Sequence, residues 1–258
     1  MTIHFYALCI LLGIVLALAA GALAGVVTGA LNVYLRIPAI LAGILTMSGL
    51  YSVNLLTMDS KANLTLIGVD TIFSLTAPLF GGDLDLAKTL VNLVLVALAV
   101  FLIYTFFKTR IGLSIRATGD NENMVRASSI NIGVTKILAL ALSNAIIALS
   151  GGILAQYQQF ADISSGVGML VVGLASVIIG EAFLGQRGIL CGLCAAVLGS
   201  IIYRLLIALA YQTNIFPSAA FRLISAVIVT IALAIPAIKQ LLDMQRKRKE
   251  NLRDAHID

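Results

Sequence analysis

Charged residues are scarce in this 258-residue chain, where Asp, Glu, Lys and Arg together make up 11% of the sequence. Soluble domains carry about 25%. The mean hydropathy of +1.05 and the 60% share of hydrophobic residues exclude that class. Several apolar runs approach the about 20 residues that a helix needs to cross a bilayer, and alternating ten-residue segments are missing. The sequence therefore predicts an all-α polytopic membrane protein.

Residues for catalysis, metal binding and nucleotide binding are also few. The two histidines, His4 and His256, lie at the chain ends, so no histidine-based catalytic or metal site can be built. Cys191 and Cys194 form a CGLC motif inside an apolar run, where small packed residues are the simpler interpretation. No Gly-Lys pair occurs, which excludes a Walker A loop. We expect no enzyme activity, no cofactor or metal bound by this chain, and no nucleic-acid partner.

Seven apolar stretches mark candidate transmembrane segments. They lie at about 5–31, 37–57, 89–107, 137–158, 166–184, 189–211 and 218–238. Glycines inside the fourth and fifth stretches predict some kinked or broken helices, which membrane proteins tolerate where backbone is buried or lines a cavity. Gly21, Gly25 and Gly29 recur every four residues, and this spacing predicts close packing by another helix of the same chain.

The distribution of lysine and arginine predicts the orientation, because these residues accumulate on the cytoplasmic side. With the C-terminus inside, only Lys61 and Lys88 lie outside, and Arg204 and Arg222 lie within segments. The other thirteen are cytoplasmic: Arg36, Lys108, Arg110, Arg116, Arg126, Lys136, Arg187, Lys239, Arg246, Lys247, Arg248, Lys249 and Arg253. Arg204 and Arg222 are functional candidates, although side chains in the outer half of a segment can also reach headgroups or a structural partner.

A polar run, RATGDNENMVRASSINIGVTK at residues 116–136, interrupts the apolar sequence on the predicted cytoplasmic side. Gly119 allows a turn, and Asp120 is a good N-cap for a short helix that starts at Asn121. Glu122 lies in the first turn of that helix and is four residues before Arg126, which predicts an ion pair.

Asn131 and Gly133 are expected to end this short helix before the next crossing begins at Lys136. Its apolar stripe is too small for strong membrane insertion. Two interpretations stay open: a solvated surface helix, and a helix that docks in a groove of a partner protein.

At this point the sequence resembles a known family. The run SIRATGDNENMVRASSINI is similar to the cytoplasmic coupling segment of ABC-importer permeases of the branched-chain amino acid and monosaccharide (inner-membrane translocator) family. Three other stretches agree in order: LRIPAILAGILTMSGLYSVNLL, GVGMLVVGLASVIIGEAFLG and AVIVTIALAIP. The resemblance covers most of residues 21–240 and is closest to amino-acid-type permeases, some linked to tryptophan or other aromatic solutes.

The resemblance implies a permease subunit of the bacterial inner membrane. Residues 1–238 would form the transmembrane domain, with a coupling segment at 108–136, and residues 239–258 a basic cytoplasmic tail. Its partners would be separate ATP-binding subunits that use the ATP, a second permease subunit, identical or different, and an external solute-binding protein. Family members usually begin with a further helical region, so we expect this chain to lack one. The charge distribution agrees, because seven segments with the C-terminus inside place the N-terminus outside.

The resemblance also implies roles for individual residues. Coupling to the ATPase would fall to Gly119, Asp120, Asn121, Glu122 and Arg126. Glu181 is a candidate brace for the cytoplasmic gate, with a helix-end salt bridge as the alternative. Candidates for the translocation path are Thr46, Ser48, Tyr51, Asn54, Ser143 and Asn144. Polar residues in membrane helices often serve only as interhelical hydrogen bonds, which is the alternative for all six.

Two other functions, ion-gradient-driven transport and intramembrane catalysis, would require different residues. A secondary transporter driven by an ion gradient would be expected to carry paired acids near the membrane midplane. Here the acids nearest the segments, such as Asp59, Asp70 and Asp162, lie in or beside external loops. An intramembrane enzyme is disfavoured because the segments contain no histidine or aspartate dyad.

Overall fold

The computed structural model describes residues 2–166, 169–185, 188–212 and 230. The chain divides into two compact units, residues 1–165 and 166–258, which are treated separately. The predicted seventh segment (residue 230 excepted), Arg222 and the basic tail at 239–258 lie outside the described residues.

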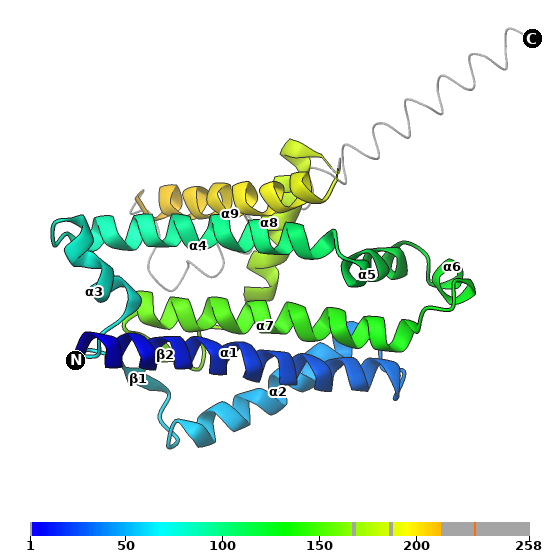
Figure 1. The fold of residues 1–258 in the computed structure, drawn as a ribbon, viewed down its shortest axis with the longest axis horizontal. Helices are drawn as coiled ribbons and strands as arrows, with labels where there is room; N and C mark the ends of the chain where they lie inside the picture. The colour runs from blue at the N-terminus through cyan, green and yellow to red at the C-terminus, as the bar shows by residue number, and fades with distance from the viewer. Residues whose placement is uncertain (1, 167–168, 186–187, 213–229, 231–258) are drawn as a thin grey trace, which may run out of the picture. The chain divides into compact units, whose positions relative to one another are not determined.

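Unit 1 consists of helices joined by short polar connections, with one small pair of strands. Its elements are α1 (Thr2–Val33), α2 (Ala39–Thr57), β1 (Asn63–Thr65), α3 (Ile72–Thr76), the 3-10 helix η1 (Ala77–Phe80), α4 (Leu84–Phe107), α5 (Arg110–Asp120), α6 (Glu122–Ala127), α7 (Ile132–Gln158) and β2 (Phe160–Asp162). The long helices α1 and α7 run side by side, and α4 runs in roughly the same direction (Figure 1). Helices α5 and α6 lie at one end of these helices, and α3, β1 and β2 lie at the other.

Among the described residues, five helices are long and apolar enough to cross a membrane. They correspond to Leu8–Val33, Ala39–Thr57, Leu84–Phe107, Ile132–Gln158 and Ile189–Leu209. The most apolar stretch of α4 has a mean hydropathy of 2.6 and contains no buried residue. Such exposed apolar surface is stable against lipid or a partner membrane protein. Five of the seven predicted segments are thus confirmed as membrane-length helices. The fifth predicted segment, 166–184, forms a helix of only 16 residues.

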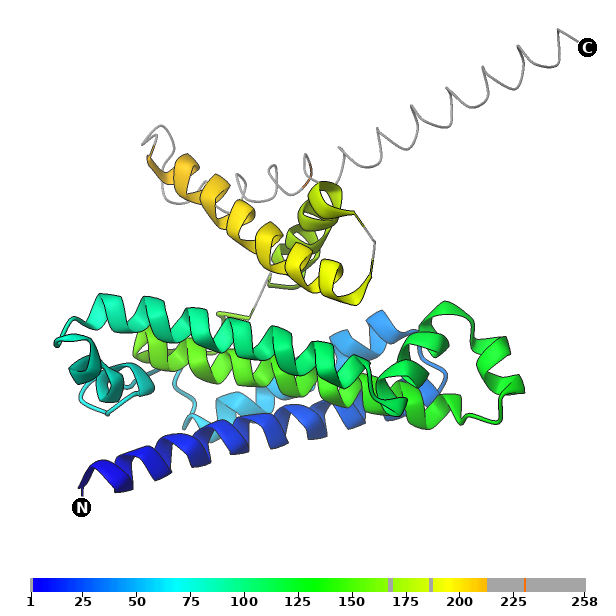
Figure 2. The same ribbon diagram turned by 45° about the horizontal axis from the view of Figure 1, so that its top comes forward.

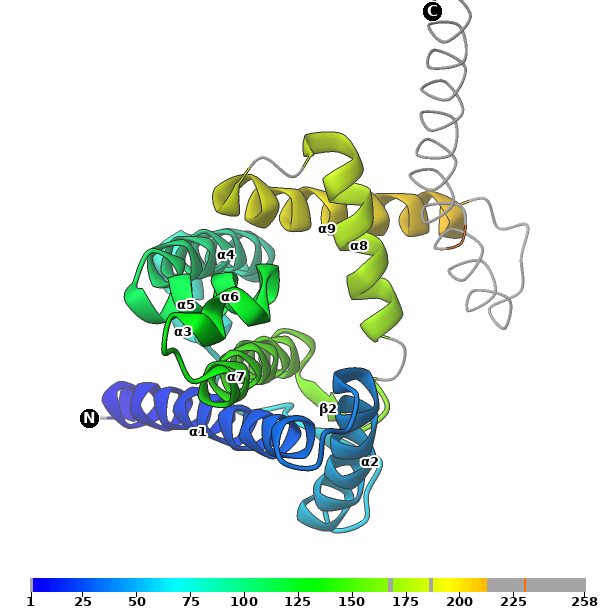
Figure 3. The same ribbon diagram turned by 90° about the vertical axis from the view of Figure 1, so that its right-hand side faces the viewer.

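The tightest packing in unit 1 joins α1 to α7, antiparallel and side by side (Figure 3). A Cβ added at Gly21 would lie 2.5 Å from Ala148 Cβ, and one at Gly29 would lie 2.9 Å from Ile137 Cα. At Gly25 an added Cβ would collide with the backbone of Leu140 and Ala141. The predicted glycine stripe is therefore confirmed as an intramolecular contact, since only glycine allows this approach.

The end of unit 1 opposite α5 and α6 is formed by residues 62–80 and 159–163, which we call the end cap. In the end cap, β1 and β2 pair antiparallel, with Leu64 opposite Ala161. Helix α3 carries Phe73, which is 1% exposed, and the Phe73 ring meets the Tyr157 ring edge-to-face with centroids 5.8 Å apart. The backbone N–H of Ile72 donates to Gln156 Oε1 at 3.1 Å. These contacts tie the α2–α4 connection to the end of α7.

Unit 2 contains α8 (Met169–Leu184) and α9 (Ile189–Gln212), which cross each other as Figure 2 shows. A Cβ at Gly180 would collide with the carbonyl of Ala195, and one at Gly199 with the carbonyl of Ser176. Ala175, Ile179 and Tyr203 form a small buried core between the helices. Glycine thus brings the two backbones into contact here as it does between α1 and α7.

Two expectations about the fold are corrected. Helix α7 runs unbroken through Gly151 and Gly152, and α8 runs unbroken through Gly173, so these glycines do not interrupt their helices. Glycine lowers helix stability by only about 1 kcal/mol, which packing can offset. The all-α prediction also omits the two strands of the end cap, each three residues long.

Candidate functional site

The polar segment, residues 116–136, lies where three helices meet. It contains the end of α5, all of α6 and the start of α7 (Figure 1). Helix α5 contacts α4, α6 and α7, and α6 contacts both α5 and α7. The segment is therefore mounted on the ends of two membrane-length helices.

Each helix start in this region is capped by the side chain that precedes it. Thr109 Oγ1 accepts from the N–H of Gly112 at 3.2 Å, and Asn121 Oδ1 accepts from the N–H of Met124 at 3.1 Å. At the start of α7, Asn131 Oδ1 accepts from the N–H of Val134 at 3.2 Å. Each cap pairs one N–H that the helix itself leaves unpaired. A strongly polar stretch thereby keeps a defined backbone.

The boundaries of the predicted short helix are corrected. Asp120 is the last residue of α5 and Gly119 lies within α5, so the N-cap of α6 is Asn121. Asp and Asn are almost equally good caps, and the sequence alone does not choose between neighbours. Asn131 begins α7 instead of ending the short helix.

The predicted ion-pair partner of Glu122, Arg126, is also wrong. Glu122 Oε1 lies 2.6 Å from Lys136 Nζ, in the second turn of α7, and no Glu122–Arg126 salt bridge forms between these two described residues. A positive φ of 61° at Ser129 turns the chain between the helices. Glu122 thereby links α6 to α7, and Arg126 stays exposed.

A single buried apolar residue anchors α6. Val125 is 1% exposed, whereas its neighbour Met124 is 61% exposed. All five coupling candidates, Gly119 to Glu122 and Arg126, are exposed. The helix is thus attached through one face and presents charged and amide side chains, with one methionine, on the other.

The connection from α4 to α5 is a tight corner. A Cβ at Gly112 would lie 2.5 Å from Phe107 Cα and would collide with the Phe106 carbonyl. Together with the Thr109 cap, this contact fixes the direction in which α5 leaves α4. Sequence reasoning missed Thr109, Gly112 and Val125. A threonine directly before a glycine-containing amphipathic stretch was the available signal for the cap.

The six path candidates do not gather at one place. Thr46 lies between α2 and α1, where its Oγ1 accepts from Thr28 Oγ1 at 2.9 Å and lies 2.9 Å from the Ala42 carbonyl oxygen. Asn144 Nδ2 donates to the Leu140 carbonyl of its own helix at 2.9 Å. The Thr46 hydroxyl is therefore paired between α1 and α2, and the Asn144 amide donates within its own helix. Ser48, Tyr51, Asn54 and Ser143 are exposed.

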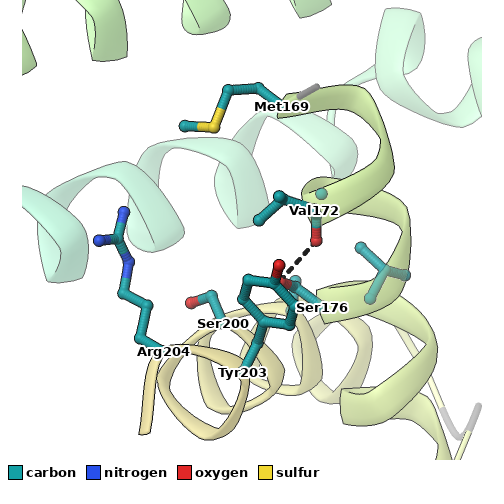
Figure 4. A pocket seen from close by; sticks show the side chains of 9 residues that line it. Met169, Val172, Ser176, Ser200, Tyr203 and Arg204 are labelled. Carbon is teal, nitrogen blue, oxygen red and sulfur yellow. Dashed lines mark hydrogen bonds between the residues drawn. The ribbon is translucent and has the colours of Figure 1, made fainter. Parts of the chain in front are cut away.

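Glu181 lies in the last turn of α8 and is half-buried, and its carbonyl accepts from the Gly185 N–H at 2.8 Å. Farther along the same helix, a hollow of about 260 Å³ opens between α8 and α9. Figure 4 shows six of the residues around it: Met169, Val172, Ser176, Ser200, Tyr203 and Arg204. No cluster of His, Cys, Asp and Glu able to hold a metal ion occurs in the described part of the chain.

Comparison with known proteins gives the chain relatives. The family model described as branched-chain amino acid transport system / permease component matches residues 1–233. The tyrosine transport system permease protein of Clostridioides difficile (strain R20291) is 36% identical over 219 residues, which cover 85% of this chain and 70% of that protein.

More distant relatives share shorter stretches. The uncharacterized protein RP368 of Rickettsia prowazekii (strain Madrid E) is 32% identical, with 65% of this chain and 57% of that protein covered. The autoinducer 2 import system permease protein LsrC of Escherichia coli O9:H4 (strain HS) is 30% identical, with 70% of this chain and 50% of that protein covered. The chain thus spans between half and 70% of the length of these relatives. No solved structure matches the chain.

Proposed function

Since this chain belongs to the family of permease components of branched-chain amino acid transport systems, we propose that it is a membrane-spanning subunit of an ATP-driven importer. The observation that carries the proposal is the polar segment. Its coupling candidates are exposed, while caps, a buried valine and an ion pair hold its backbone on α4 and α7. A fixed backbone that presents open polar side chains can bind a partner at low entropic cost.

The chain would work with separate subunits. An ATP-binding subunit, which supplies the nucleotide chemistry that this sequence lacks, would bind α5 and α6 on the cytoplasmic side of the bacterial inner membrane. A second permease subunit would complete the path, and an external binding protein would deliver the solute to the end cap. The C-terminal tail would lie in the cytoplasm, as the charge distribution predicts.

Transmission from the ATPase would pass through the contacts of α6. Closure of the ATP-bound subunits would move α6, the Glu122–Lys136 pair would carry that movement to α7, and the Gly112 corner would carry it to α4. Helix α1 would follow α7, because their backbones touch along the glycine stripe. Binding energy for ATP would then shift the path between outward-open and inward-open states. Glu181 would brace the inner gate.

The solute is proposed to be an amino acid or a related small compound. The relative from Clostridioides difficile is named for tyrosine transport and the Escherichia coli relative for autoinducer 2 import. The second is less similar and less completely covered, so the first supports the substrate class more strongly. Of the path candidates, the exposed Ser48, Tyr51, Asn54 and Ser143 have side chains available for a solute.

Capture of an ATPase tests the proposal. The full chain is purified from native membranes in mild detergent beside an Asp120→Lys, Glu122→Lys variant, and associated P-loop ATPases are quantified by mass spectrometry. We expect the variant to hold at least about tenfold less ATPase, which corresponds to about 1.4 kcal/mol of binding free energy. The matched control is Asp59→Lys, Asp85→Lys, which makes the same charge change at exposed positions on the other side. This control should retain the ATPase.

If the wild-type chain captures no ATPase, the proposal fails. The competing function is transport driven by an ion gradient. Uptake that survives ATP depletion but collapses with an ionophore would favour it, whereas an importer of the proposed kind loses uptake when ATP is depleted.

A further inference from the structure

The hollow between α8 and α9 combines one cation with three hydroxyl groups in an otherwise apolar wall. Its polar side chains are Ser176, Ser200, Tyr203 and Arg204, and the rest of the wall includes Met169, Val172 and Val177. Arg204 is exposed, and no carboxylate of the described residues forms a salt bridge with it. Figure 4 shows the Arg204 and Ser200 side chains on the same side of the Tyr203 ring.

The hydrogen-bonding state of the two serines decides what they can offer. Ser176 Oγ donates to the carbonyl of Val172 at 2.8 Å, and Ser200 Oγ donates to the carbonyl of Val197 at 2.8 Å. Each hydroxyl proton is thus used within its own helix, and the remaining lone pairs can only accept. Arg204 can only donate, and its planar guanidinium suits a carboxylate.

A ligand that matches this wall has a carboxylate, a donor such as an ammonium group, and an apolar part. The volume of about 260 Å³ lies just below the about 300 Å³ at which pockets for drug-sized ligands begin. We propose that the hollow binds a zwitterionic amino acid with an apolar or aromatic side chain. Arg204 holds the carboxylate, Ser176 and Ser200 accept from the ammonium group, and the side chain packs against Met169, Val172 and Tyr203. This inference rests on the proposed importer function.

The position of Arg204 in α9 supports a role in transport. Arg204 lies inside the membrane-length stretch Ile189–Leu209, eight residues before the end of α9 at Gln212. At about 1.5 Å per residue this is about 12 Å from that helix end. Charges inside membrane segments persist where they face a partner, water or a ligand. With α9 running outward, as the charge distribution predicts, a solute that enters from outside would meet Arg204 first.

Cysteine labelling tests the site independently of ATP. Ala196, which lines the hollow on α9 and is assigned no contact with the ligand, is changed to cysteine in the full chain with Cys9, Cys191 and Cys194 replaced by serine. The protein is placed with its captured partners in phosphatidylcholine nanodiscs. Labelling by a charged methanethiosulfonate is timed with and without L-tyrosine. At ten times the Kd about a tenth of the sites is empty, so labelling should slow about tenfold. The control keeps Cys194 alone, which is exposed on the same helix outside the hollow, and its rate should not change.

Variants and analogues then assign the contacts. Adding Arg204→Gln to Ala196→Cys should abolish protection by L-tyrosine, and Arg204→Lys should restore part of it because the positive charge returns. Tyramine, which lacks the carboxylate, should protect no better than buffer with Arg204 present. The deaminated analogue 3-(4-hydroxyphenyl)propionate should protect less than L-tyrosine.

The site is overturned by no labelling of Ala196→Cys, by labelling that L-tyrosine and L-leucine leave unchanged, or by protection that Arg204→Gln leaves intact. A hollow filled by lipid would show rates that change between phosphatidylcholine and phosphatidylethanolamine nanodiscs and ignore amino acids, which also overturns it. The labelling experiment and the ATPase capture test different claims, so either claim can fail without the other. An ATPase captured without protection removes only this site, and a missing ATPase removes the importer.

Discussion

The two polar ends of unit 1 are built in opposite ways. In the end cap, Phe73 is 1% exposed, and the Ile72 N–H is bonded to the Gln156 side chain of α7. Lys88 Nζ lies 5.1 Å from the centroid of the Tyr157 ring, so even a charged side chain is used internally. In the polar segment, Val125 alone is buried in α6, and the charged side chains of that helix are exposed.

The difference separates polar groups that serve the fold from those that the proposed function would use. In the end cap, the Ile72 N–H, Thr71 and Ser74 find partners inside the chain, as buried or half-buried polar groups must. The polar segment fixes its backbone with two caps, at Asn121 and Asn131, but leaves Asp120, Asn123 and Arg126 exposed. A fixed backbone with open side chains is the arrangement that binds a partner at low entropic cost.

The largest expected effect comes from breaking the end cap. Phe73→Ala removes a buried ring and should lower the free energy of unfolding by about 3–5 kcal/mol, measured as a lower thermal transition in detergent. The control is Leu79→Ala, because Leu79 lies in the same end cap but is 79% exposed. Where the Phe73 variant is folded, it should still capture the ATPase. Loss of capture by folded protein would contradict the separation of the two ends.

The next effect separates the buried anchor of α6 from its exposed face. Val125→Ala removes two buried carbon groups and should cost about 1.5 kcal/mol at about 0.8 kcal/mol each. It should also weaken ATPase capture, because α6 loses its anchor. Met124→Ala, at the exposed neighbour, should leave thermal stability unchanged and weaken capture only. Equal stability losses for the two variants would show that Val125 is not the anchor.

The membrane helices and their closest contact could be predicted from the sequence. Long apolar runs have few alternatives to helices in a membrane, and Gly21, Gly25 and Gly29 allow only a close neighbour. The predicted segments 37–57 and 137–158 end at the same residues as α2 and α7, and they begin within five residues of them. These features depend on short-range patterns, which one sequence contains in full.

The remaining features depend on geometry that a single sequence does not contain. Residues 63–65 and 160–162 pair across about one hundred residues as strands of three, too short for an alternating pattern. The choice of Lys136 over Arg126 as the partner of Glu122 depends on the turn at Ser129. The residues around the α8–α9 hollow come from two helices that cross closely at Gly180 and Gly199. Nothing in the sequence distinguishes these two glycines from the others in the apolar segments.

A smaller effect tests the corrected N-cap. Asn121→Ala removes the acceptor for the Met124 N–H and should cost about 1 kcal/mol, while Asp120→Ala should change stability by less than about 0.5 kcal/mol. Hydrogen exchange of the α6 amides gives a second readout, since protection should fall only in the Asn121 variant. The reverse order of the two variants would restore Asp120 as the cap.

The smallest effect concerns the ion pair that links α6 to α7. Glu122 and Lys136 are 49% and 34% exposed, so the pair should contribute only about 0.2–1 kcal/mol. Lys136→Met should lower the thermal transition slightly in low salt, and the difference from wild type should shrink in about 1 M salt, where the Debye length is about 3 Å. Arg126→Met is the matched control and should leave stability unchanged. If transport slows far more than stability falls in Lys136→Met, the pair transmits movement from α6 to α7. A transport rate equal to wild type would leave the Gly112 corner as the route from the polar segment into the membrane helices.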